Sequence, residues 1–155
     1  KIYYYIKTHL MVRMDVNEGD YVIRGKQFVI VKTMLAPIGL SICNDLNFPE
    51  MMRGLSLRGA KVIILSAAWP KRAGFIWDRL LAVRAFENQV YLLSANQTGG
   101  EYYGHSKIID YTGKTVEEIR SGEGLRIVSI DMVKLERWRK IVPFYKVRRS
   151  KLYGS

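Results

Sequence analysis

Short apolar segments and helix-like segments alternate through the middle of this chain, and the alternation limits the possible folds more than any other feature. Residues 38–42 and 61–66 are apolar and rich in β-branched residues, as buried strands are. Residues 49–57 and 75–88 place apolar side chains at helical spacing, and an apolar strand over 89–96 follows directly. This order of strands and helices predicts an α/β fold, with helices packed on a sheet whose strands are at least partly parallel.

The flanking segments add strands at both ends and a helix near the carboxyl terminus. Their β-branched and aromatic content predicts further strands at 2–6, 28–33, 102–109 and 125–131. Asp110 to Gly113 suits a hairpin turn between the last two of these strands, because glycine tolerates the backbone angles of such a turn. The last helix is expected from Met132 to about Val142. We find no repeat or linker, so residues 1–155 form one domain or part of one.

The composition indicates a compact protein without secretory features. Hydrophobic residues make up 48% of the 155 positions, which is enough for one substantial core. The single cysteine excludes an internal disulfide framework and suits a reducing compartment. Neither a signal peptide nor an apolar stretch of the roughly 18–20 residues of a membrane span is recognisable. We therefore expect a cytoplasmic protein with no membrane partner.

The charge is strongly positive and concentrated at one end. Of 25 basic and 14 acidic residues, which give a net charge of +11, residues 132–155 contain eight basic residues and one acidic residue. A nucleic-acid partner would require exposed aromatic residues among the basic ones, and only Trp138, Tyr145 and Tyr153 hint at that. A nucleic-acid partner is therefore not expected, despite the basic tail.

The only cysteine, Cys43, lies where the predicted strand 38–42 ends, and Pro49 then opens a helix. A thiol at such a turn is exposed at the carboxyl end of a strand, close to backbone N–H groups that favour its ionised form. A free thiol with a pKa near ~8.5 is only about 3% ionised at pH 7, so a neighbouring cation would help. The thiol alone leaves two interpretations open, a nucleophile or a small buried hydrophobic residue.

Several ordered blocks resemble the nitrilase or carbon–nitrogen hydrolase superfamily. The first is Cys43-Asn44-Asp45-Leu46-Asn47-Phe48-Pro49-Glu50, the second Arg84-Ala85-Phe86-Glu87-Asn88-Gln89-Val90-Tyr91, and the third Gly104-His105-Ser106 with Ile109-Asp110. The resemblance covers essentially the whole chain. It implies a Glu-Lys-Cys catalytic triad and a four-layer α-β-β-α sandwich, of which this chain would supply the later part. No metal or organic cofactor is implied.

The resemblance assigns three catalytic residues in this chain. Cys43 matches the nucleophile, Lys7 matches the catalytic lysine, and Glu18 matches an acidic residue between them that would orient Lys7 or the departing amine. The family's general-base glutamate lies well before the lysine, and only six residues precede Lys7 here. No residue of this chain is assigned to it. We therefore expect the carboxy-terminal portion of such an enzyme, inactive by itself.

The chemistry implied is hydrolysis of an amide through a thioester on Cys43, with the oxyanion held by Lys7 and the backbone N–H of Asn44. Two alternatives remain open: a superfamily N-acyltransferase that hands the acyl group to an amine, and a non-catalytic scaffold or binding relative. His9 and His105 also allow a Cys–His pair. One cysteine and two distant histidines lack the ligand spacing of a zinc site, so no metal is expected.

The substrate and the assembly are predicted from the same resemblance. Ala67-Ala68-Trp69-Pro70 with Arg72 resembles a loop of ω-amidase-type enzymes, which deamidate dicarboxylic monoamides. Arg72 is expected to bind a substrate carboxylate through two parallel hydrogen bonds, and Trp69 either contacts the substrate or packs in the core. A homodimer or higher homo-oligomer is implied, with the basic segment Lys146 to Ser155 as a dimer arm.

Overall fold

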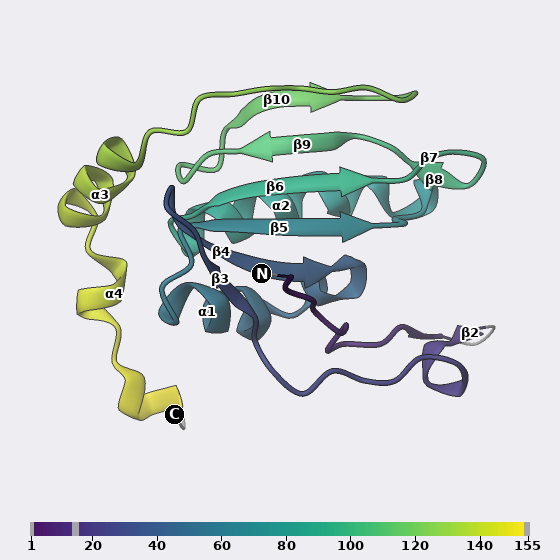
Figure 1. Cartoon of the computed structure of the whole chain (residues 1–155), viewed down its shortest axis with the longest axis horizontal. Helices are drawn as coiled ribbons and strands as arrows, with labels where there is room; N and C mark the ends of the chain where they lie inside the picture. The colour runs from purple at the N-terminus through teal and green to yellow at the C-terminus, as the bar shows by residue number, and fades with distance from the viewer. Residues whose placement is uncertain (1, 14–15, 154–155) are drawn as a thin grey trace.

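A mixed β-sheet forms the centre of the protein (Figure 1). The computed structural model describes residues 2–13 and 16–153. The strand order is β10-β9-β6-β5-β4-β3, with β4, β5 and β6 parallel and the remaining neighbours antiparallel. The strands are β3 (Ile30–Lys32), β4 (Pro37–Ile42), β5 (Val62–Ala67), β6 (Tyr91–Asn96), β9 (Ser106–Ile109) and β10 (Thr115–Ile119). The parallel strands therefore end at one common edge, which is where the predicted nucleophile follows β4.

Two helices cover one face of this sheet (Figure 1). They are α1 (Pro49–Leu57) and α2 (Gly74–Glu87), which lie on the chain between β4 and β5 and between β5 and β6. Pro49 suits the first turn of α1 because its missing N–H has no helical partner there. The core between helices and sheet is formed by fully buried side chains, among them Leu46, Met52, Leu55, Ile63, Leu65, Trp77, Leu81 and Leu92. The predicted helix-on-sheet arrangement is thus confirmed.

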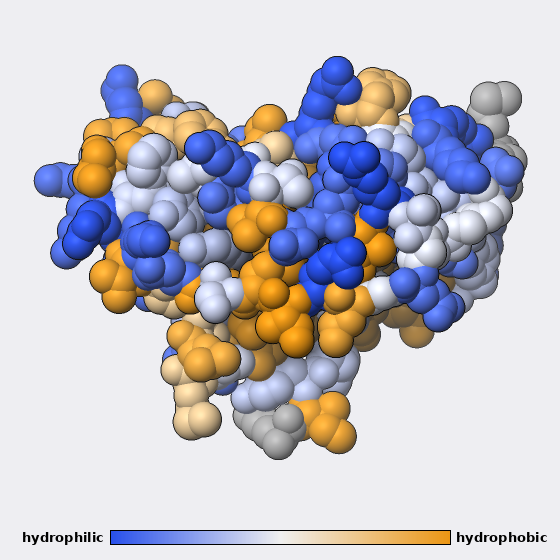
Figure 2. Space-filling view, turned by 90° about the horizontal axis from the view of Figure 1, so that it is seen from above, coloured by the Kyte–Doolittle hydropathy of each residue, from blue (hydrophilic) through white to orange (hydrophobic). Residues whose placement is uncertain are grey.

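The opposite face of the sheet is partly open. Along β5, Ile63 and Leu65 are buried, whereas the alternating residues Ile64 and Ser66 are exposed. Hydrophobic residues also gather among hydrophilic ones in the middle of the surface seen from the β10 edge (Figure 2). The described residues therefore form two layers, one sheet and one set of helices, rather than the four layers that the resemblance implies for the complete fold.

The remaining elements are short or lie at the ends of the sheet. They are β1 (Val12–Arg13), β2 (Val16–Asn17), β7 (Thr98–Gly99), β8 (Tyr102–Tyr103), α3 (Met132–Ile141) and α4 (Phe144–Val147). Within the described ranges, four 3₁₀ helices span Glu18–Asp20, Cys43–Asn47, Lys71–Ala73 and Ser150–Tyr153. None of the helices in the described part of the chain has the length and apolar content needed to cross a bilayer.

The basic tail packs at the end of the sheet away from the ends of β4, β5 and β6 (Figure 1). Arg139 of α3 donates two hydrogen bonds to the carbonyl oxygen of Gln89, at 3.1 and 2.8 Å. The hydroxyl of Tyr145 donates to the carbonyl oxygen of Asn88. These contacts satisfy carbonyl groups at the end of α2 that lack helical partners. The described part of the tail thus has a packing role within the chain.

Three predicted strands differ from the structure. The strand expected over 102–109 is divided at Gly104 and His105, both with positive φ, into β8 and β9, which belong to different sheets. Residues 125–131 form no strand, because the turn at Asp110 to Gly113 reverses the chain at once and 115–119 pairs with β9 instead. Residues 2–6 are not assigned to a strand, because among the described residues no segment forms a ladder of backbone hydrogen bonds with them. The helix predicted over 49–57 is confirmed at both ends.

Candidate active site

Cys43 lies on a sharp turn between β4 and the 3₁₀ helix Cys43–Asn47, as the sequence predicts. Its backbone angle φ is 44°, in the left-handed region that non-glycine residues rarely adopt. The Asp45 carboxylate accepts the N–H of Ile42 at 2.8 Å, which fixes the backbone just before the turn. The strained turn therefore presents the Cys43 side chain at the edge where the parallel strands end.

The surroundings of the thiol raise its pKa. Burial has the largest effect and disfavours the thiolate, and the Glu18 carboxylate adds to it. The backbone N–H groups of Ala68 and Asn44 and the positive charge of Lys7 act in the opposite direction and lower the pKa. Burial outweighs these effects, so the pKa of the thiol lies above its ordinary value. This corrects the sequence-based expectation of a thiolate kept ionised by its neighbours.

Lys7 and Glu18 form a close ion pair. The Lys7 Nζ atom lies 2.8 Å from Oε1 and 2.6 Å from Oε2 of Glu18, and Glu18 also accepts the N–H of Met11 at 2.7 Å. Burial acts to raise the pKa of Glu18, but these hydrogen bonds and the Lys7 charge hold it below its usual range. Lys7 is 8% exposed, so its ammonium group is held in place within the protein. The structure therefore brings together two residues that the sequence separates by an irregular loop.

The residue after the nucleophile is also firmly held. The side-chain amide of Asn44 donates to the carbonyl oxygens of His9 and Leu10, at 3.2 and 3.1 Å. Its own carbonyl oxygen accepts a hydrogen bond from Asn47 at 2.8 Å. The Asn44 backbone N–H is thereby fixed beside the sulfur, where an oxyanion donor is needed.

Both histidines are engaged by carboxylates. Nδ1 of His9 lies 2.9 Å from Asp45, and Nδ1 of His105 lies 2.6 Å from Glu118. The groups that act on the pKa of Cys43 are backbone N–H groups, Lys7 and Glu18. No histidine is among these groups, which favours a lysine-assisted cysteine over the Cys–His pair that the sequence left open.

The two residues predicted to bind substrate occupy different environments. Trp69 is only 3% exposed, and its indole N–H donates to the carbonyl oxygen of Ala73 at 2.8 Å. Its backbone N–H donates to Asn96 at 2.7 Å, and its ring packs against Trp77. Arg72 is exposed in the 3₁₀ helix Lys71–Ala73. Burial favours the packing interpretation of Trp69, whereas Arg72 remains available for a ligand.

Sequence reasoning missed two features of the site. The backbone N–H of Ala68 acts on the sulfur because β5 ends beside β4, and a backbone group leaves no side-chain signal in a sequence. Asp45 binds Tyr5 and His9, which lie 40 and 36 residues away along the chain, and no local pattern around Asp45 indicates these contacts. Within residues 2–13 and 16–153, no cluster of three or more His, Cys, Asp or Glu side chains is arranged to hold a metal ion.

The sequence is similar to known enzymes over most of its length. A sequence model of the carbon-nitrogen hydrolase family matches residues 2–140. The deaminated glutathione amidase of Rattus norvegicus is 34% identical, over 97% of this chain and 50% of its own. The 2-oxoglutaramate amidase of Bacillus subtilis is 34% identical, over 96% of this chain and 58% of its own. The chain spans about half the length of these curated relatives.

The fold is likewise similar to solved structures. The NitFhit protein of Caenorhabditis elegans superposes with a TM-score of 0.85 at 32% identity, over 96% of this chain and 39% of that one. The agreement extends over nearly all of the present chain, so the predicted α/β fold is confirmed.

Proposed function

The chain belongs to the carbon-nitrogen hydrolase family, and from that membership we propose that the protein hydrolyses a non-peptide carbon–nitrogen bond of a small amide, with Cys43 as nucleophile. The main support for the proposal is the backbone conformation of Cys43 and the groups that surround its sulfur. The residue occupies a strained turn, and Lys7, Glu18 and two backbone N–H groups all act on its sulfur. A buried structural cysteine would have no need of such surroundings.

In the proposed reaction the Cys43 sulfur attacks the amide carbonyl carbon while a base takes the thiol proton. The carbonyl oxygen becomes an oxyanion, which Lys7 and the backbone N–H of Asn44 stabilise. The C–N bond then breaks, the amine leaves with the proton from the base, and a thioester remains. Water attacks the thioester, the same base takes a proton from it, and the acid departs as the thiol is restored.

The raised pKa of Cys43 explains why this scheme needs a base. A neutral thiol must lose its proton during attack, and Lys7 is already paired with Glu18. We assign Glu18 to orienting Lys7, because both of its carboxylate oxygens contact the ammonium group. We assign no residue of this chain as the general base, which the family resemblance implies to be a further glutamate. The 155-residue chain by itself is therefore expected not to turn over amides.

The proposed substrate is a small amide that also carries a carboxylate. Arg72 is exposed on the turn that follows Ala68, and a guanidinium group binds a carboxylate through two parallel hydrogen bonds. The relatives named 2-oxoglutaramate amidase and deaminated glutathione amidase support this class. The single free cysteine supports a reducing, cytoplasmic location, and family resemblance supports a homo-oligomer.

Acylation of Cys43 tests the proposal without requiring the missing base. A p-nitrophenyl ester of a small acid has a leaving group that needs no proton, so the chain is expected to release about one equivalent of nitrophenol at mildly alkaline pH. Peptide mass spectrometry should locate the acyl group on Cys43, and the Cys43→Ala variant should release none. Acylation elsewhere, or equal release by the variant, contradicts the proposal.

A further inference from the structure

The Asp45 carboxylate is the most heavily bonded acidic group near Cys43. It is fully buried, at 0% exposure. Its Oδ2 atom accepts the N–H of Ile42 at 2.8 Å and the hydroxyl of Tyr5 at 2.7 Å. Its Oδ1 atom accepts the N–H of His9 at 3.0 Å and lies 2.9 Å from Nδ1 of the same residue. Each of these contacts involves a residue that lies within two positions of Lys7 or Cys43 in the sequence.

The donors surround Lys7 along the chain. Tyr5 lies two residues before Lys7 and His9 lies two residues after it, while Ile42 directly precedes Cys43. The buried Asp45 carboxylate therefore binds one residue on each side of Lys7 and also the backbone N–H of the residue before Cys43. The Asn44 amide adds two further bonds to the same segment, at the carbonyl oxygens of His9 and Leu10.

The hydrogen bonds fix the orientation of each group. The hydroxyl of Tyr5 has one proton, which it donates to Asp45, so the hydroxyl of Thr8 must donate to the Tyr5 oxygen at 2.7 Å. The N–H of Thr8 also donates to that oxygen, at 3.0 Å. The ring of His9 stacks on Phe48, with centroids 3.9 Å apart and planes inclined by 13°. These contacts close a rigid network around Lys7.

We propose that Asp45, acting through Tyr5 and His9, is a positioning residue that holds the Lys7 ammonium group beside the Cys43 sulfur. The inference rests on the proposed function, because it assumes that Lys7 acts on Cys43. It extends that function by assigning three residues to the placement of the lysine.

A local helix cap does not account for this arrangement. Capping the turn requires only the bond from the N–H of Ile42, three residues before Asp45. The other three donors come from positions 36 and 40 residues away, and two of them belong to His9. Burying a carboxylate is costly unless its oxygens are fully bonded, so the network is a specific link between two distant segments.

The charges that face Cys43 determine in which direction its pKa should change when the Lys7 segment is loosened. Lys7 lowers the pKa of the thiol and Glu18 raises it, and the effect of Lys7 is the larger one. Because the two side chains are bonded to each other, loosening the segment moves both away from the sulfur. With burial and the backbone N–H groups of Ala68 and Asn44 unchanged, loss of the net lowering effect of the pair would then raise the pKa of the thiol further.

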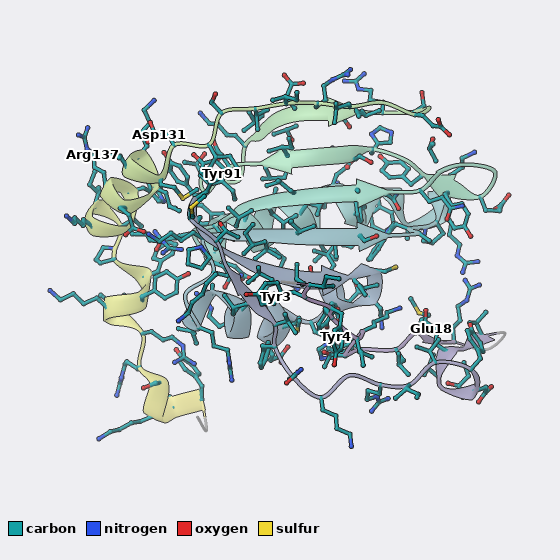
Figure 3. The ribbon with its side chains drawn as sticks, viewed as in Figure 1. Tyr3, Tyr4, Glu18, Tyr91, Asp131 and Arg137 are labelled. Carbon is teal, nitrogen blue, oxygen red and sulfur yellow. The ribbon has the colours of Figure 1, made fainter. Side chains whose placement is uncertain are left out.

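The test compares two tyrosine variants of the 155-residue chain. Tyr5→Phe removes the hydroxyl that binds Asp45, and Tyr91→Phe removes a hydroxyl bonded to Asp131 at the opposite end of the sheet from Glu18 (Figure 3). The pKa of Cys43 is measured from the pH dependence of its alkylation by iodoacetamide. We expect Tyr5→Phe to slow alkylation at about pH 8 by roughly three- to tenfold, whereas Tyr91→Phe leaves it unchanged. Circular dichroism and urea unfolding show whether both variants fold.

If Tyr5→Phe fails to fold, His9→Gln replaces it, with His105→Gln as its control, because both histidines pair with a carboxylate. The Lys7→Met variant separates the inference from the proposed function. If Lys7→Met slows alkylation but the Tyr5 or His9 variant behaves like its control, Asp45 has only a structural role and the inference is wrong. If Lys7→Met leaves alkylation unchanged, the lysine does not act on the thiol, and both the inference and that part of the proposed function fail.

Discussion

The ammonium group of Lys7 contacts both carboxylate oxygens of Glu18, at 2.8 and 2.6 Å. The lysine therefore approaches Cys43 with much of its charge balanced by a carboxylate. Burial is the main reason why the pKa of the thiol is raised beside this cation, and the Glu18 charge adds to it. The pairing with Glu18 also keeps a long, flexible side chain in one orientation, which a group that must stabilise a transient oxyanion requires.

Replacing Glu18 by Gln is expected to lower the pKa of Cys43. The change removes a negative charge that raises the pKa, while Lys7 keeps its own charge. Alkylation of the thiol at about pH 8 should become a few-fold faster. Glu136→Gln, which removes the partner of Lys61 on the tail helix, is the control and should leave the rate unchanged. A slower rate in Glu18→Gln would mean that the pair has lost its position as well as its charge.

The native protein is expected to alkylate more slowly than the same chain unfolded in urea at about pH 8. Burial raises the pKa of Cys43 in the folded state, so a smaller fraction of the thiol is ionised there. The rate in the folded protein should continue to rise with pH beyond the unperturbed value of about 8.5. A native rate that exceeds the unfolded one at this pH would show instead that the site activates the thiol without substrate.

Acid is expected to destabilise the fold through Glu18 and Glu118. Burial acts to raise the pKa of both groups, but hydrogen bonds from Lys7 to the first and from His105, Arg120 and Lys107 to the second leave both below their usual range. A depressed pKa stabilises the folded state above the unfolded value of about 4.3, and this stabilisation is lost as the pH falls through the folded value. The urea concentration at the unfolding midpoint should therefore decrease as the pH is lowered below about 4.3. The decrease should be less steep in the Glu118→Gln variant. If the midpoint depends on pH equally steeply in the native protein and in Glu118→Gln, Glu118 does not contribute to the acid destabilisation.

Replacing Gly25 by Ala should destabilise the protein and disturb the site. An added Cβ would lie 2.0 Å from the carbonyl oxygen of Ile6, and the N–H of Gly25 donates to the carbonyl oxygen of Lys7 at 2.8 Å. The overlap is with backbone, so the Lys7 segment must shift, at a cost of about 1–3 kcal/mol in the free energy of unfolding. Gly124→Ala, which meets only a flexible methyl group of Ile119 at 3.3 Å, is the matched control. Urea unfolding and the alkylation rate measure the two effects.

Replacing Trp69 by Ala distinguishes a role of Trp69 in core packing from a role in substrate binding. Because the ring is buried against Trp77, we expect the free energy of unfolding to fall by roughly 3–5 kcal/mol. Phe75→Ala removes an exposed aromatic ring, 65% accessible, and should change stability little. A Trp69→Ala protein of normal stability would favour the substrate interpretation instead.

Much of the fold was predictable because the pattern of a segment reflects its local geometry. The α1 helix, the parallel strands before and after it and the turn that bears Cys43 follow from side-chain period, Pro49 and the glycine after the helix. The strand expected at 125–131 was wrong because a tight turn pairs 115–119 with β9 first, and pairing is a long-range choice that local pattern does not contain.

The sequence by itself determined which chemical groups the protein carries: a thiol at the end of a strand, a lysine, an acidic residue and the blocks that mark the family. Only the tertiary structure decided how those groups behave. The pKa of Cys43 is raised because burial outweighs its charged neighbours, and Asp45 binds Tyr5 and His9, 40 and 36 residues away. Desolvation and contacts between distant segments exist only once the chain has packed, so no pattern along the sequence could supply them.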